Sequence, residues 1–190
     1  MTSAASVAGD DRLRLFLALQ LPAATLDVVE RWQAKHIVEG RRVPREHLHV
    51  TLAFLGGRPA AELTSIVAAL RDACRSVRRI ALEPAGWRET RSVGMVVLRD
   101  LGDEAAGLAR RLHAGLEALG VYRPESREWL PHLTVVRFQK RPRLDPPLPG
   151  TGTFVPSEAA AYLSRLHPTG ARYEVLERVS LIEEDESHEP

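Results

Sequence analysis

The stretch His47-Leu48-His49-Val50-Thr51-Leu52-Ala53-Phe54-Leu55-Gly56 decides how this chain is interpreted, because part of it recurs further along the sequence. His49-Val50-Thr51-Leu52 is matched by His132-Leu133-Thr134-Val135, each with a histidine and a threonine one residue apart in an apolar run. In a β-strand, alternate side chains project from the same face. Each segment is therefore predicted to present an imidazole beside a hydroxyl on one face and apolar side chains on the other.

The hydrophobic pattern on either side of these segments predicts alternating strands and helices. Strands are expected at 13–19, 48–54, twice within 80–98, and at 133–138, 159–166 and 173–182; helices are expected at 23–36, from Pro59 to about Cys74, and at 104–119. Gly56-Gly57 is expected to end the first motif strand. One motif falls in each half of this order. The sequence therefore predicts a bilobal α+β fold, with two pseudo-symmetric, antiparallel-rich sheets flanked by helices around a central cleft.

The composition fits one globular domain, with 44% hydrophobic and 27% charged residues among 190. We expect this domain at residues 12–182, with a disordered segment at 1–11 and a disordered acidic tail at 183–190. The net charge is +1 although the tail holds five acidic residues, so the rest of the chain is more basic. Nearly all of its positive charge is arginine, whose planar fork suits phosphate. A nucleotide or RNA partner is compatible with this balance.

Further features of the sequence predict a cytoplasmic, monomeric protein that does not contact membranes. The first residues have no basic segment followed by an apolar run, and no apolar stretch reaches membrane-spanning length. Cys74 is the single cysteine and cannot form an internal disulfide, which is typical of a reducing compartment. No exposed apolar repeat indicates a subunit interface.

The two histidines predict paired acid–base chemistry if they meet across the cleft. Histidine titrates near neutrality, so one imidazole can accept a proton while the other donates one. In-line attack on a phosphodiester needs this pair, a base at the attacking oxygen and an acid at the leaving oxygen. Thr51 and Thr134 can donate hydrogen bonds to the nonbridging phosphate oxygens. Such a pair predicts a bell-shaped pH profile with limbs near neutrality.

Four segments carry a resemblance to the two-histidine (2H) phosphoesterase superfamily, in particular to RNA 2′,3′-cyclic phosphodiesterases, also called 2′-5′ RNA ligases. The resemblance spans most of the chain. The first decamer and the Pro-His-x-Thr segment are specific when they occur together. The matching segments are Arg14–Leu19 followed by Leu21-Pro22, His47–Gly56, Pro131–Arg137, and Ser164–Leu166 with Gly170–Tyr173.

The resemblance implies hydrolysis of RNA or nucleotide 2′,3′-cyclic phosphate ends to a 2′-phosphate, without a metal or another cofactor. The reverse reaction would join a cyclic phosphate end to a 5′-hydroxyl. Carried onto this chain, His49 is the proton donor to the leaving 3′-oxygen, and His132 is the base that activates water. Thr51 and Thr134 would hold the phosphate.

Arg137 also matches the family pattern, in which a basic residue follows the second motif. It would bind the substrate phosphate. Strand alternation counted from His132 and Thr134 assigns Arg137 to the opposite face, unless a bulge or the end of the strand re-aims it. A structural or surface ion pair is its alternative role.

Two other functions remain open from the residues alone. His47 shares strand parity with His49, so His47, His49 and His132 could hold zinc in a metal hydrolase with water as the fourth ligand. A non-enzymatic module that binds RNA ends would keep the basic cleft but catalyse no turnover. Chelation separates the zinc enzyme from paired histidine chemistry, and a cyclic phosphate substrate separates an enzyme from a binding module.

Overall fold

The computed structural model describes residues 12–123, 125–168 and 170–181. The expected disordered start at 1–11 and acidic tail at 183–190 therefore lie outside the described residues. Within the described ranges, none of the helices combines the length and apolarity that crossing a bilayer requires.

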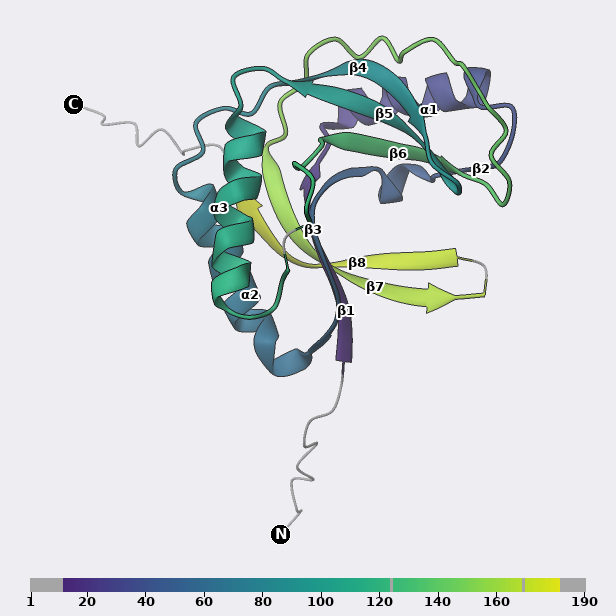
Figure 1. Ribbon diagram of the computed structural model, residues 1–190. Helices are drawn as coiled ribbons and strands as arrows, with labels where there is room; N and C mark the ends of the chain where they lie inside the picture. Colours follow the sequence, from purple (N-terminus) through teal and green to yellow (C-terminus); the bar gives the residue numbers. More distant parts are fainter. Residues whose placement is uncertain (1–11, 124, 169, 182–190) are drawn as a thin grey trace, which may run out of the picture.

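The strands form one continuous, strongly curled antiparallel sheet (Figure 1). Between β3 and β6, the described residues form one register pair, Val50 with Leu133. The expected α+β, antiparallel-rich fold is confirmed, and the two expected sheets are the two halves of this sheet. The strand order is β4 (Leu82–Glu89), β5 (Val93–Asp100), β6 (His132–Arg137), β3 (His49–Pro59), β1 (Arg12–Gln20), β7 (Glu158–His167) and β8 (Gly170–Ser180), with β2 (Arg41–Arg42) beside β6.

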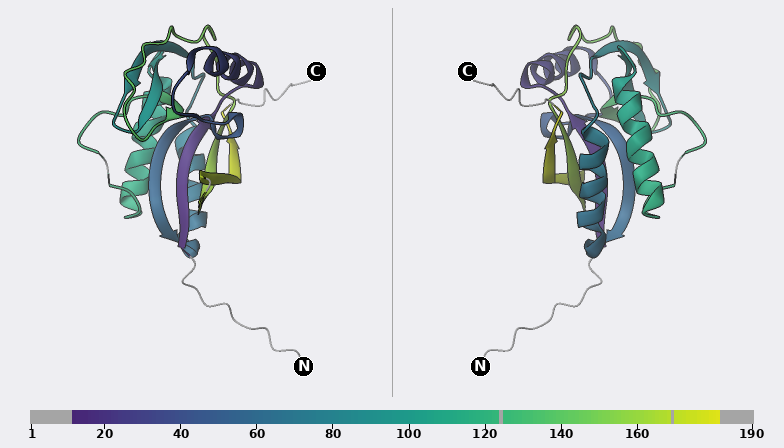
Figure 2. Two further views of the ribbon diagram at one scale, coloured as in Figure 1. Left: turned by 90° about the vertical axis from the view of Figure 1, so that its right-hand side faces the viewer. Right: turned by 90° about the vertical axis from the view of Figure 1, so that its left-hand side faces the viewer.

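In the part of the chain that the structure describes, three α-helices cover the outer face of this sheet: α1 (Ala23–His36), α2 (Leu63–Cys74) and α3 (Glu104–Ala118). Helices α2 and α3 pack side by side, and Figure 2 shows them on one flank of the molecule. α2 contacts β7 and β8, and α3 contacts β3 and β5. The main hydrophobic core lies between the helices and the sheet.

Strand β1 has both faces buried, which explains its unbroken apolar run. Leu15, Leu17 and Leu19 belong to the main core, whereas Phe16 and Ala18 belong to a second, smaller cluster with Ala160 and Tyr162. Successive strand residues point to opposite faces, so this second cluster lies on the concave face, away from the helices. The concave face is the one that carries the candidate site.

The prediction that Gly56-Gly57 ends the first motif strand is wrong, because β3 continues to Pro59. Gly56 has a φ of 66°, which a glycine adopts without the strain of a Cβ atom. The β1–β3 register shifts at this point, so the glycine lies at a bulge within the strand. A 3₁₀ turn, Ala60–Glu62, then separates Pro59 from the start of α2 at Leu63.

Candidate active site

The fold brings the two His-x-Thr segments onto facing strands at the seam between the halves of the sheet. Val50 pairs with Leu133 in antiparallel register. His49 and Thr51 flank Val50 on β3, and His132 and Thr134 flank Leu133 on β6, so these four side chains project from the face opposite to the buried pair. Thr51 also pairs laterally with Ala18 of the concave cluster. The four side chains therefore share the concave face.

Both imidazoles are oriented in the same way by the backbone. Nδ1 of His49 lies 2.8 Å from the carbonyl oxygen of His47, and Nδ1 of His132 lies 2.8 Å from the carbonyl oxygen of Leu130. A carbonyl oxygen only accepts, so each Nδ1 must carry the hydrogen. Nε2 is then the titrating nitrogen of each ring. This shared arrangement leaves both Nε2 atoms free to accept or donate a proton.

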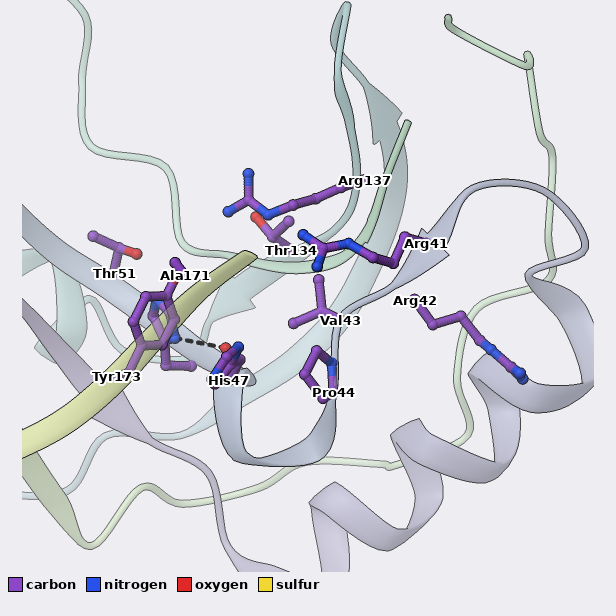
Figure 3. A pocket seen from close by; sticks show the side chains of 11 residues that line it. Arg41, Arg42, Val43, Pro44, His47, Thr51, Thr134, Arg137, Ala171 and Tyr173 are labelled. Carbon is purple, nitrogen blue, oxygen red and sulfur yellow. Dashed lines mark hydrogen bonds between the residues drawn. The ribbon is translucent and has the colours of Figure 1, made fainter. Parts of the chain in front are cut away.

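A cavity of about 130 Å³ lies at this seam (Figure 3). Four of the five predicted site residues line it, and they come from β3 and β6. His132 is not among the lining residues. The lining residues are Arg41, Arg42, Val43, Pro44, His47, His49, Thr51, Thr134, Arg137, Ala171 and Tyr173.

Aromatic side chains surround His49 on the β1–β7–β8 side. The ring of Phe16 lies 4.8 Å from the imidazole, and that of Tyr173 lies 5.7 Å away, between ring centroids. Burial lowers the pKa of His49 from its ordinary 6.5 to about 4, and the nearby positive charges of His47, His132 and Arg137 act in the same direction. The hydrogen bond to the His47 carbonyl opposes this shift. His49 is therefore neutral in the free protein at neutral pH.

A β-bulge turns Arg137 into the cavity. Thr134 pairs with Met95 and Val136 pairs with Gly94, so Val135 is an extra residue in β6. With this extra residue in the strand, alternation places Arg137 on the same face as Thr134.

The bulge is fixed by bonds from outside the sheet ladder. The carbonyl of Val135 accepts from the Val43 amide at 2.9 Å and from Nε2 of Gln33 at 2.7 Å. Gln33 also donates to the carbonyl of Val43 at 3.0 Å, and its side chain is 2% exposed. This buried amide of α1 thus ties the bulge to the segment that follows β2.

Two arginines add positive charge to the cavity. Arg41 is directly opposite Arg137 in the β2–β6 register. Like charges at directly opposed positions are destabilising, so the pair is suited to an anion that lies between them. Figure 3 shows the guanidinium groups of Arg41 and Arg137 near Thr134, whereas Arg42 points away from them. The cavity therefore combines hydroxyl donors with two cations.

The expectation that His47 shares a strand with His49 is wrong. His47 ends a 3₁₀ turn, Arg45–His47, and packs against Tyr173 with 4.4 Å between ring centroids. Burial lowers its pKa. Among the described residues, no three His, Cys, Asp or Glu side chains are grouped so that they could hold a metal ion. The geometry thus gives no support to a zinc site formed by His47, His49 and His132.

Comparison with known proteins shows the family. The model of the 2′-5′ RNA ligase superfamily matches residues 21–177, and the chain belongs to this superfamily. An RNA 2′,3′-cyclic phosphodiesterase of Escherichia coli K12 is 30% identical over 172 residues, covering 88% of this chain and 96% of the relative. A protein of the same name from Thermus thermophilus is 34% identical over 183 residues, covering 89% and 90%.

Solved structures agree with this relationship. The crystal structure of E. coli LigT complexed with 3′-AMP has a TM-score of 0.78 and 25% sequence identity, and covers 90% of this chain and 99% of that chain. The crystal structure of a Thermus thermophilus protein, TT0787, has a TM-score of 0.74 and 30% identity, covering 89% and 98%.

Several residues of the cavity were not predicted from the sequence. Tyr173 lies in the Gly170–Tyr173 segment that carries the resemblance, so that signal was available. Arg41 reaches the cavity through its pairing with Arg137, and no local pattern reveals that contact. The odd spacing from Thr134 to Arg137, across two consecutive valines that are both buried, is a sequence trace of the bulge.

Proposed function

We propose that this protein hydrolyses RNA or nucleotide 2′,3′-cyclic phosphate ends to 2′-phosphates, by paired histidine acid–base catalysis and without a metal. The observation that carries this proposal is the pair of imidazoles on facing strands, each fixed through Nδ1 so that Nε2 is free. The names of the E. coli and Thermus relatives support the choice of a cyclic phosphate.

The cavity suits the charge of the phosphodiester. The hydroxyls of Thr51 and Thr134 make no hydrogen bond with other described residues, so both can donate to nonbridging oxygens. Arg137 and Arg41 balance the negative charge that develops on these oxygens during attack. We assign Thr51, Thr134 and Arg137 to substrate binding on this basis, and we add Arg41.

The two proton transfers are divided between the histidines. Nε2 of His132 takes a proton from water as the water oxygen attacks phosphorus. The bond from phosphorus to the 3′-oxygen breaks, and Nε2 of His49 gives its proton to that oxygen. The product carries a 2′-phosphate and a free 3′-hydroxyl. Exchange with solvent then returns a proton to His49 and removes one from His132.

The low pKa of His49 must rise before this residue can act as an acid. Its neutral form dominates in the free protein because the imidazole is desolvated. A bound phosphodiester is an anion, and a negative charge beside Nε2 favours the imidazolium. Substrate binding therefore prepares the acid. In kcat/KM, which reports the free enzyme, the limb due to His49 is therefore expected near pH 4 and not near neutrality as the sequence alone suggested, and in kcat it is expected at higher pH.

The test is product analysis with nucleoside 2′,3′-cyclic phosphates. We expect conversion to the 2′-phosphate, which phosphorus NMR detects. The rate of this conversion should be the same after treatment with EDTA. Release of the 3′-phosphate would mean that the 2′-oxygen is the leaving group. Loss of activity on chelation would favour the zinc enzyme. Binding without turnover would support the RNA-end-binding module.

The setting of the protein is also a proposal. We infer a reducing, cytoplasmic compartment, which is supported by a single cysteine, Cys74, that is buried. Burial raises the pKa of its thiol to about 12, so the thiolate is not available for oxidation. We also propose a monomer, and sedimentation of the full chain tests it.

A further inference from the structure

A second basic hollow lies at the free edge of β4, apart from the cavity described above. Its volume is about 500 Å³, and arginine is its most frequent lining residue. It lies where the end of β4 meets the loop that follows β6, which runs along the outside of the sheet in Figure 1. The residues that line it are Trp87, Arg88, Glu89, Arg141, Arg143 and Leu144.

A buried carboxylate builds this hollow. The Glu89 side chain is 2% exposed and accepts hydrogen bonds from Nε of Arg141 at 3.0 Å, from the Arg143 amide at 3.1 Å and from the Leu144 amide at 2.6 Å. Arg143 has a φ of 63°, a left-handed conformation that is strained for a residue with a Cβ atom. Two backbone bonds to Glu89 hold the chain at this point. Strain maintained in this way is a frequent mark of a ligand site.

The charge of the hollow is only partly balanced. Glu89 pairs with Arg141, but the side chains of Arg88 and Arg143 make no ion pair or hydrogen bond with any residue in the described ranges. The indole Nε1 of Trp87 is buried and also has no partner among these residues. Trp87 packs against the main core and forms the floor of the hollow. Unpaired guanidinium groups at its rim are the groups that bind the phosphates of single-stranded nucleic acid.

The register of the sheet connects this hollow to the candidate active site. Thr134 pairs with Met95, and Met95 pairs with Arg88. Laterally paired residues share a face, so Arg88 is on the concave face with Thr134, two strand spacings or about 10 Å away. β4 is the last strand on this side. A chain that leaves the cavity along this row therefore passes Arg88 and reaches the hollow at the edge.

We propose that this hollow binds the RNA nucleotides on the 5′ side of the cyclic end. Arg88 and Arg143 contact phosphates there, and the protein turns over oligoribonucleotide ends more efficiently than mononucleotides. This inference rests on the proposed function, because it concerns the remainder of the same substrate.

The experiment compares two substrates, a nucleoside 2′,3′-cyclic phosphate and a short oligoribonucleotide with a 2′,3′-cyclic phosphate end. In the variant Arg88→Gln/Arg143→Gln, we expect kcat/KM for the oligoribonucleotide to fall by about tenfold, and its salt dependence to weaken by about 1.4 in the log–log slope for two lost phosphate contacts. For the mononucleotide we expect a change of less than about twofold, since it does not extend to the hollow.

Arg99→Gln is the matched control. Arg99 lies on β5 with the parity of Met95, so it belongs to the same face, but it is paired with Glu83. Its substitution is expected to leave both substrates unaffected. The variant Glu89→Gln should weaken turnover of the oligoribonucleotide alone, because the loop that carries Arg143 loses a charged acceptor.

Equal losses on both substrates, or no loss on either, would overturn the proposal. If neither substrate is turned over by the wild type, the proposed function fails, and fluorescence anisotropy with a labelled oligoribonucleotide still tests the hollow. A weaker affinity in the double variant, with Arg99→Gln unchanged, would then support the site. If the double variant binds with the affinity of the wild type, the proposed site is wrong.

Discussion

The two His-x-Thr segments have the same local geometry but different surroundings. In both, Nδ1 of the histidine is held by the carbonyl two residues earlier, at the same distance of 2.8 Å. His49 lies under the aromatic cluster of β1, β7 and β8, whereas His132 pairs laterally with Val97 in β5. The backbone repeats, and the packing around it does not.

This difference shows how a repeated motif can supply two different proton-transfer groups. The tautomer of each ring is set locally, by a strand and its preceding carbonyl. Protonation is set by the rest of the fold, because desolvation by Phe16 and its neighbours disfavours the charged form of His49. The lowered pKa of His49 therefore comes mainly from the strands around it and not from the local geometry that the two motifs share.

The largest expected effect comes from removing either imidazole. His49→Ala and His132→Ala should each lower kcat on a cyclic phosphate by about 10²- to 10⁴-fold, because each removes one proton transfer. An aryl phosphodiester, whose leaving group needs no proton, should restore much of the activity of His49→Ala but not of His132→Ala. His36→Ala, at the end of α1 away from the cavity, is the control. Rescue of His132→Ala instead would mean that His132 is the acid and His49 is the base.

The hydroxyls should matter less and more equally. Thr51→Val and Thr134→Val each remove a hydrogen bond to a charged oxygen, which is worth about 1.5–3 kcal/mol, or about 10- to 150-fold in kcat. Circular dichroism should be unchanged, and Thr151→Val in the loop before β7 should behave as the wild type. A loss as large as that of a histidine variant would mean that the threonine is more than a phosphate donor.

Opening the aromatic cluster should return the pKa of His49 toward that of a solvated imidazole. Tyr173→Ala admits water beside His49, so the pKa of His49 is expected to rise from about 4 toward 6.5. NMR titration of the imidazole resonances measures this shift. Leu166→Ala, at the 70% exposed end of the same hairpin, should leave the titration unchanged. If the pKa of His49 is unaltered in Tyr173→Ala, the ring of Tyr173 does not contribute to lowering it.

The smallest expected effect is on stability. Because the pKa of His49 is lowered in the folded state, the unfolded chain binds a proton more readily below pH 6.5. Stability should be constant for this group above pH 6.5 and should fall as the pH is lowered from 6.5 to 4. Urea midpoints across this range measure the loss, and His49→Gln, which does not titrate, should reduce it. An unchanged pH dependence in that variant would assign the loss to other groups, such as His47.

The elements of the fold were largely predictable, because most of them are encoded by local patterns. Helix α1 ends where the periodicity of Leu26, Val29 and Trp32 gives way to Gly40 and Pro44, and its predicted range is confirmed. The end of β3 was not predictable, since a glycine in a strand can mark either a turn or a bulge, and tertiary pairing with β1 decides between them. The two-residue strand β2 is likewise too short to leave a periodic signal.

The site was predictable to the extent that it depends on alternation along a strand. His49 with Thr51, and His132 with Thr134, are each brought to one face by that rule. The direction of Arg137 depends on an extra residue in β6 and on Gln33, which is more than 100 positions away from Val135 in sequence. The aromatic environment of His49 comes from three other strands. Such contacts have no counterpart in the local sequence.

The seam at Val50 and Leu133 separates the framework of the site from its chemistry. Among the described residues, the backbone ladder between β3 and β6 is limited to this pair, and the cavity lies beside it. The position of the cavity is therefore a property of the scaffold. The side chains at its border set its chemistry, so the same frame can carry a different reaction.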